Sequence, residues 1–187
     1  LMPAVHRGVS VAYCDAPGAL ETADLPTLIG IAPAPQSWDE PRRRSYYEEY
    51  NRHLLYDLMV HEAVPGHALQ LAHARNAHAP THVRAAMPSG LFIEGWAVYA
   101  EELMAHRGFV VDGGRRGSFR LHQLKMQLRV IINTILDIRV HTRGMTEAEA
   151  RRLMATKGFQ QEGEIVGKWN RARLTSGQLP TYYVGYK

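Results

Sequence analysis

The sequence predicts a mainly α protein of the α+β class, organised as a single domain with a small N-terminal β element. Residues 1–34 contain the candidate strands, because "VSVAYC" and "PTLIGIAP" are short apolar runs bounded by proline and glycine. Residues 45–187 carry apolar positions at helical spacing over long stretches. With 187 residues, the chain is long enough to enclose one hydrophobic core.

Turn and capping residues divide the helical region into segments. Gly108 and Gly144 end two of them, and Thr146 with Glu149 forms a capping-box pattern at the start of another. Residues 35–44 are expected to form a surface loop before the first helix. The expected helical segments span residues 45–76, 91–108, 117–144, 147–158 and 162–174.

The composition argues against two classes of protein. The net charge of +4 would suit nucleic acid, but the arginines are scattered and lack an aromatic-rich motif, so we expect no nucleic-acid partner. The longest apolar stretch, "VIINTILDI", is too short and too polar to cross a bilayer, which predicts no membrane span. The single cysteine, Cys14, excludes an internal disulfide and is interpreted as a small buried hydrophobe.

The ends of the chain suggest a piece of a longer protein. The sequence begins at Leu1 rather than at a methionine, and "YVGYK" offers no obvious stop. We therefore expect a C-terminal fragment whose N-terminal part is missing. The compartment stays open between the cytoplasm and export, because a leader would lie in the missing part.

The stretch "MVHEAVPGHALQ", residues 59–70, carries the first candidate site. A zinc-protease helix has the pattern H-E-x-x-H, in which histidines four residues apart lie about 40° apart around the helix and reach one ion. Here the second histidine is His67, six residues after His61. A regular helix would place it about 120° away, too far to share a metal.

Pro65 and Gly66 predict a break between the two histidines. Pro65 has no N–H and its ring clashes with the carbonyl four residues earlier, while Gly66 permits a positive φ. Such a break could return His67 to the side of His61, with Glu62 next to it. The alternative is a kinked helix on which both histidines are ordinary polar residues.

Glu94 is the candidate third ligand, which a zinc site with an open position requires. It lies in "LFIEGWAVYAEEL", an apolar helix where a carboxylate is costly to bury without a partner such as a metal. Glu101 follows seven residues later on the same face and could orient a ligating histidine. In the alternative, Glu94 lies at the solvent edge and Glu101 pairs with an arginine.

These motifs resemble those of known proteins. "IEGWAVYAEEL" is similar to the glutamate helix of gluzincin peptidases of the aminopeptidase N type, which carry N-E-G-F-A and a further glutamate. "HEAVPGHALQ", "DIRVHTRGMTEAEA" and "LPTYYVGYK" resemble more closely a large bacterial family of uncharacterised proteins, often described as lipoproteins, with the signature H-E-A-x-P-G-H-H-x-Q. The resemblance covers about residues 10–187, the C-terminal third of a typical member.

The resemblance implies a gluzincin-like helical metallopeptidase core. It implies that His61, His67 and Glu94 bind Zn²⁺ and that Glu62 is the general base. One departure is Ala68, where the family usually has a second histidine, so that position is not expected to be a ligand. The absent N-terminal part puts one wall of the cleft in doubt.

Four polar residues recur at every fourth position of the longest expected helix. They are Arg129, Asn133, Asp137 and His141. Because the family-like "DIRVH" lies among them, we favour a stripe that lines the cleft, with Asp137 orienting a ligating histidine and His141 contacting substrate. A stripe that faces solvent is the alternative.

A peptidase also needs a donor for the oxyanion that forms during the reaction. In gluzincins a tyrosine or histidine often provides it, and Tyr182 matches the family-like pattern better than Tyr183. The alternative is a pair of packed tyrosines near a terminus. Arg171 could bind a substrate carboxylate, and Arg173 could do so equally well.

The sequence therefore predicts a zinc-dependent hydrolase, and most specifically a metallopeptidase in which Glu62 activates a metal-bound water. Its expected partner is a peptide or amide substrate. Two rival functions stay open: a zinc amidase that acts on a non-peptide substrate, and a non-catalytic scaffold that binds peptides at a degenerate site. A base beside a ligand, Glu62, favours catalysis.

Overall fold

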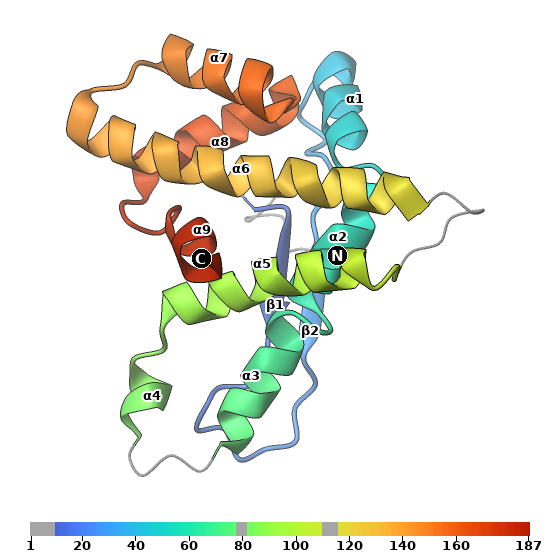
Figure 1. Cartoon of the computed structure of the whole chain (residues 1–187), viewed down its shortest axis with the longest axis vertical. Coiled ribbons are helices and arrows are strands. Elements are labelled where there is room, and N and C mark those ends of the chain that lie inside the picture. Colours follow the sequence, from blue (N-terminus) through green and yellow to red (C-terminus); the bar gives the residue numbers. More distant parts are fainter. Residues whose placement is uncertain (1–9, 78–81, 110–115) are drawn as a thin grey trace.

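The computed structural model describes residues 10–77, 82–109 and 116–187 (Figure 1). Within these residues the chain forms one two-stranded sheet and nine helices, which confirms the mainly α class with a small N-terminal β element. The elements are β1 (Ala12–Asp15), β2 (Leu28–Ile31), α1 (Glu40–Glu49), α2 (Arg52–Glu62), α3 (His67–Asn76), α4 (Val83–Ala86), α5 (Gly90–His106), α6 (Arg116–Arg143), α7 (Glu147–Gly158), α8 (Glu162–Leu174) and α9 (Thr181–Tyr186).

The two strands expected near the N-terminus pair antiparallel, with Ala12 opposite Ile31. Tyr13 lies opposite Gly30, where a Cβ atom would come within 2.1 Å of the Tyr13 ring. Glycine is therefore required at this position for the ring to cross the strand. β1 packs against α2, so the sheet lies beside the stretch that carries both candidate histidines. Residues 1–9, at the start of the expected β region, lie outside the described part of the chain.

The helices pack around the two longest, α5 and α6, which run side by side in Figure 1. α2 contacts both helices, and α9 contacts both as well. α7 and α8 cover α6 on the side away from α5. A hydrophobic cluster joins these three helices and the turn before α9: Ile132, Leu136, Ala150, Met154, Ile165, Trp169, Ala172 and Leu179.

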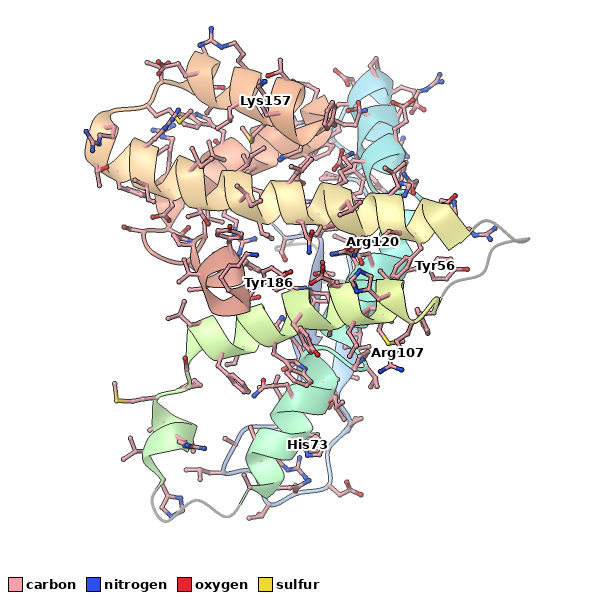
Figure 2. The ribbon with its side chains drawn as sticks, in the orientation of Figure 1. Tyr56, His73, Arg107, Arg120, Lys157 and Tyr186 are labelled. Atoms are coloured by element: carbon pink, nitrogen blue, oxygen red, sulfur yellow. The ribbon has the colours of Figure 1, made fainter. Side chains whose placement is uncertain are left out.

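Two glycines bring α9 against α5. A Cβ atom at Gly95 would lie 2.2 Å from the backbone carbon of Gly185, so no larger residue fits either helix at this crossing. Figure 2 labels Tyr186 where α9 faces α5 and α6, and its hydroxyl donates a hydrogen bond to Glu102 Oε2 at 2.5 Å. This contact fixes the position of α9, an element that the sequence patterns did not predict.

The first helix begins five residues earlier than expected. The Asp39 side chain accepts a hydrogen bond from the Arg42 N–H at 2.9 Å, and Pro41 occupies the first turn, so α1 starts at Glu40. The surface loop predicted for residues 35–44 is therefore wrong in its second half. The start signal was present in the sequence as an N-cap aspartate followed by a proline.

The helix expected over residues 45–76 is three helices. Asn51 ends α1 and caps α2, because its side chain accepts hydrogen bonds from the His53 and Leu54 N–H groups. The second break is the expected one at Pro65, between α2 and α3. The capping box of Thr146 and Glu149 is present at the start of α7. None of the described helices combines the length and hydropathy that a membrane crossing needs.

Candidate metal centre

The chain between α2 and α3 forms a tight turn that returns His67 to the side of His61. α2 ends at Glu62, and the Gly66 N–H donates a hydrogen bond to the Val60 carbonyl at 3.0 Å. His67 is then the first residue of α3. The two imidazole rings meet at a centroid distance of 4.6 Å with their planes 85° apart.

Glycine is required at position 66 because the turn leaves no space for a Cβ atom there. A Cβ atom there would lie 1.9 Å from the His61 carbonyl oxygen and 2.3 Å from that of Val60. Its φ of −74° is ordinary, so the expectation that Gly66 supplies a positive φ is wrong. The glycine permits the turn to fold closely onto the end of α2.

α5 carries the third residue of the group and is tied directly to the turn. The Trp96 indole N–H donates a hydrogen bond to the Pro65 carbonyl at 2.8 Å. Glu94 lies two residues earlier on the same helix. The "EGW" stretch thus holds the turn through its tryptophan, presents its glutamate to the histidines, and accommodates α9 at its glycine.

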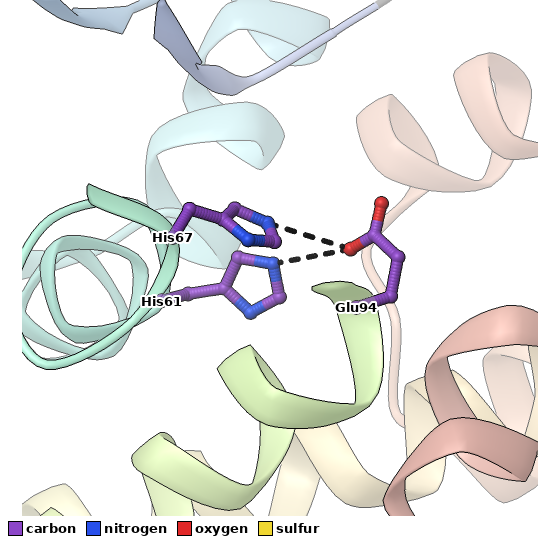
Figure 3. Close-up of side chains that lie close together, drawn as sticks. All are labelled: His61, His67 and Glu94. Atoms are coloured by element: carbon purple, nitrogen blue, oxygen red, sulfur yellow. Dashed lines mark ion pairs between the residues drawn. The ribbon is translucent and has the colours of Figure 1, made fainter. Parts of the chain in front are cut away.

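His61, His67 and Glu94, here called the ligand cluster, point to one place (Figure 3). Glu94 Oε2 lies 3.6 Å from His61 Nε2 and 3.5 Å from His67 Nε2. One potential ligand atom from each residue lies within 4.8 Å of the others. The spacing lets three atoms surround a common centre, as they do around a metal ion at 2.0–2.2 Å from each ligand.

The two histidines of the ligand cluster are buried and Glu94 is half-buried, but hydrogen bonds do not satisfy all three side chains. His61 and His67 are each 8% exposed, and Glu94 Oε2 has no hydrogen-bond partner among the described residues. Burial favours the neutral acid, yet the two imidazoles outweigh it and lower the pKa of Glu94 to about 2. The donor set is therefore two imidazole nitrogens and one ionised carboxylate, which suits zinc.

Glu101 holds His61 from behind. His61 Nδ1 lies 2.6 Å from Glu101 Oε1, which leaves Nε2 directed at Glu94. Burial lowers the pKa of His61, but the contacts with Glu101 and Glu94 outweigh it, and the net shift is upward. His67 Nδ1 has no comparable partner among the described residues.

Asp57 adds a carboxyl group that the sequence patterns did not single out. It is fully buried on α2, one turn before His61, and burial together with the charge of Glu101 raises its pKa well above the usual range. The signal in the sequence was the spacing of four residues between Asp57 and His61.

Glu62 lies beside the ligand cluster without joining it. Its side chain lines the same cavity, is 9% exposed, and has no hydrogen bond or ion pair within the described part of the chain. Burial raises the pKa of Glu62, and the charges of Glu94 and Glu101 raise it further against the opposing effect of the histidines. A free carboxylate of raised pKa is equipped to accept a proton.

Tyr182 reaches the ligand cluster from α9. Its ring lies 6.2 Å from the His61 ring, centroid to centroid, and nearly parallel to it. Its hydroxyl oxygen accepts hydrogen bonds from Arg171 at 2.9 Å and from Gln178 at 3.2 Å. Because both bonds use lone pairs, the hydroxyl proton is left to donate to another group.

A cavity of about 530 Å³ connects these residues. β1 forms part of its wall, and Cys14 lines it rather than lying in a core. The reading of Cys14 as a buried hydrophobe is therefore corrected. Burial, with a further contribution from Glu62, raises the pKa of the Cys14 thiol to about 11, so the thiol stays protonated.

The four polar residues of the stripe on α6 have two different environments. Two of them line the cavity, and the other two contact backbone groups elsewhere in the fold. Arg129 and Asn133 line the cavity. Asp137 instead accepts hydrogen bonds from the Gly177 N–H at 3.1 Å, so it orients a loop and not a histidine ligand. His141 lies 2.9 Å from the carbonyl oxygens of Ala172 and Thr175 at the end of α8, and the structure gives it no place at the cavity.

Comparisons with other proteins agree with this fold. A candidate lipoprotein of unknown function from Shewanella oneidensis has a solved structure that is 39% identical over 93% of this chain and 31% of that chain, with a TM-score of 0.76. A candidate lipoprotein from Colwellia psychrerythraea is 22% identical, with a TM-score of 0.74, and the match covers 99% of this chain and 29% of that one. The chain thus spans about a third of the solved structures it matches.

A comparison with curated proteins found no match. The family model described as "Bacterial protein of unknown function (DUF885)" matches residues 1–187. The chain therefore belongs to the bacterial DUF885 family.

Proposed function

We propose that this chain carries the catalytic centre of a zinc-dependent hydrolase, most specifically a metallopeptidase. The observation that carries the proposal is the ligand cluster, in which two imidazoles and a carboxylate from two separate segments point at one centre. Buried groups of this kind are expected to be hydrogen-bonded to one another or to share a metal. The first alternative fails for Glu94 Oε2, which has no hydrogen-bond partner in the described residues.

The choice of zinc rests on the chemistry of the donors. Magnesium and calcium favour sites made of oxygen atoms, whereas two of the three donors here are imidazole nitrogens. Three protein ligands leave a fourth position open, as catalytic zinc sites require. Zinc held by His61, His67 and Glu94 would supply Lewis acidity and would lower the pKa of a water towards about 7.

The side chains around the ligand cluster match the tasks of amide hydrolysis. Glu62, with its raised pKa and free carboxylate, takes the proton of the attacking water and passes it to the leaving amine. Tyr182, whose hydroxyl proton is free, donates a hydrogen bond to the carbonyl oxygen as negative charge develops there. Glu101 keeps the His61 ring in its orientation.

Two other functions use the same geometry. A zinc amidase acting on a non-peptide substrate would employ the same ligands and the same base. A peptide-binding scaffold would not need Glu62, whose free carboxylate beside the ligands favours a catalyst.

Export from the cytoplasm is the compartment we favour. The Shewanella protein, 39% identical, is described as a candidate lipoprotein, a class that is exported and anchored. A soluble reporter fused to the full-length protein would reveal the compartment.

The first test is the zinc content of the purified protein by elemental mass spectrometry. We expect about one zinc per chain in the wild type. His67→Ala removes one ligand and should lose the zinc. His73→Ala, an exposed histidine on the same helix α3, labelled in Figure 2, is the matched control and should keep it.

Two results would count against the proposal. Wild-type protein that takes up no zinc when zinc is supplied would remove the metal centre. Equal zinc content in the His67→Ala and His73→Ala variants would place the metal elsewhere.

A further inference from the structure

One face of α8 forms the wall of the cavity on the side of Tyr182. Glu164, Lys168 and Arg171 line it from positions at helical spacing, and Arg129 of α6 joins them. Three of these four side chains are cationic. Lys168 and Arg129 are only 5% and 8% exposed, so these are charges removed from solvent rather than a solvated surface.

The cations on this wall outnumber the carboxylates that could balance them. Arg129 pairs with Glu164, and the same Glu164 is the one carboxylate among the described residues within ion-pair distance of Lys168 Nζ, at 3.6 Å. The other nearby carboxylate, Glu49, is engaged by Lys125 at 2.8 Å. Burial, together with Arg129 and Arg171, lowers the pKa of Lys168 to about 7, as expected where positive charge is in excess.

Arg171 is the cation of this wall that lacks a carboxylate partner in the described part of the chain. Its guanidinium donates to the Gln178 side-chain oxygen at 2.8 Å and to the Tyr182 hydroxyl at 2.9 Å, both neutral acceptors. An arginine side chain presents five N–H donors in one plane, and both of these bonds leave from Nη2. The Nε–H and Nη1–H donors therefore have no partner among the described residues and are left for a carboxylate.

Arg171 is also close to the reaction centre. Its guanidinium carbon lies 5.9 Å from the centroid of the Tyr182 ring, which in turn lies 6.2 Å from the His61 ring centroid. The distance from the guanidinium carbon to the His61 ring centroid therefore cannot exceed the sum of these two distances. At about 3.5 Å per extended residue, a segment of at most about three residues spans that distance.

We propose that Arg171, with Lys168 beside it, binds the free α-carboxylate of the substrate, so that the enzyme cleaves near the C-terminus of short peptides or N-acyl amino acids. This inference rests on the proposed function. A peptide has its free α-carboxylate on the amine side of every one of its bonds. A carboxylate held at Arg171 therefore belongs to the leaving group, which would be one to about three residues long.

Arg173, which the sequence could not distinguish from Arg171, is not part of this wall. It is exposed, and its guanidinium lies 5.8 Å from the centroid of the Trp169 ring. It therefore serves as the matched control, an arginine two residues away on the same helix.

The test compares the binding of trialanine and trialanine amide by calorimetry. We would use the zinc-loaded protein with Glu62→Gln, so that neither peptide is hydrolysed during the measurement. A charge-assisted hydrogen bond to the half-buried Arg171 predicts that the free acid binds about 10- to 100-fold more tightly than the amide. Adding Arg171→Gln should bring that ratio close to one, and adding Arg173→Gln should leave it unchanged.

Each outcome decides one of the two claims. Equal affinity for acid and amide, or a preference that survives Arg171→Gln because the carboxylate binds the metal, would overturn the inference. Arg171→Gln could also displace Tyr182, but this would weaken the binding of both peptides alike. The ratio of the two affinities therefore reports carboxylate recognition alone. Hydrolysis of trialanine by the wild type is measured alongside, and its absence with an intact binding ratio would overturn the peptidase proposal alone.

Discussion

The ligand cluster and a second buried group, Arg129 with Tyr50 and Glu164, line the same cavity, but only the second is closed by its own hydrogen bonds. Arg129 donates to the Tyr50 hydroxyl at 2.6 Å and to Glu164, and Tyr50 donates to the other oxygen of Glu164. We call these three residues the Arg129 cluster. In the ligand cluster, Glu94 Oε2 lies 3.5–3.6 Å from the Nε2 atom of each histidine, which is too far for a good hydrogen bond.

This difference separates a structural role from a functional one. In the Arg129 cluster the buried charges are paired with one another inside the protein. Removing one of them should therefore lower the free energy of unfolding. In the ligand cluster, the lone pairs of Glu94 and the histidines are directed at a shared point instead. The partner of these side chains is expected to be an ion from outside the chain. Removing one of the side chains should therefore reduce metal binding and turnover.

Glu62→Gln should produce the largest change and would test the functional half of the comparison. The amide keeps the shape of the side chain but cannot accept the proton, so peptide hydrolysis should fall about 10²- to 10⁴-fold. Zinc content should stay at the wild-type level, because Glu62 is not a ligand. Steady-state kinetics with parallel elemental analysis makes the measurement, and Glu48→Gln, at an exposed position of α1, is the control.

Full activity in Glu62→Gln would remove that residue from the role of base. Loss of zinc together with activity would instead make Glu62 part of the metal site.

Arg129→Met tests the structural half. It leaves Glu164 buried without its main partner, so the free energy of unfolding should drop by about 3–5 kcal/mol in urea denaturation. Adding Glu164→Gln should recover part of the loss, because the unpaired charge is then removed. Arg44→Met, which breaks an exposed ion pair with Glu48, should change stability by less than about 1 kcal/mol.

If Arg129→Met proves as mild as Arg44→Met, the Arg129 cluster does not hold the fold together. The contrast between the two buried groups would then lose its structural side.

Glu101→Gln should give the smallest of the three effects. It tests whether a residue that contacts a ligand, without being one, contributes to metal binding. It weakens the contact that orients His61, and zinc affinity should fall about 10- to 100-fold in competition with a chelator. Asp137→Asn is the matched comparison, because the sequence pattern suggested the same role and the structure directs Asp137 to the Gly177 N–H. It should leave zinc affinity unchanged, and an equal loss in both variants would contradict the assignment.

Local signals in the sequence were enough to predict helices α5 to α8, the strand pair and the break before His67. These features depend on residues near one another in the chain: the ring of Pro65, the capping box at Thr146, and apolar residues at regular spacing. The start of α1 also depends on a local signal, because Asp39 caps the helix at Glu40 within the segment predicted as a loop.

The candidate ligands could also be proposed from the sequence, because histidine and glutamate side chains are costly to bury without a partner. His61 with His67 and Glu94 with Glu101 each lie within one short segment, and the pairing of the two segments needed only the chemistry of a metal. The contact between Glu101 and His61 follows the expected geometry at 2.6 Å. The metal and the reaction stay predictions until the zinc content is measured.

The choice between equivalent residues was decided by the tertiary structure alone. Nothing local distinguishes Arg171 from Arg173, or Asn133 from Asp137, because each pair consists of similar residues on one helix. The rotation of α8 and α6 against their neighbours turns Arg171 and Asn133 to the cavity and leaves Arg173 exposed. The sequence by itself determined which chemistry is available, and long-range packing, such as Gly95 against Gly185, decided which side chains meet.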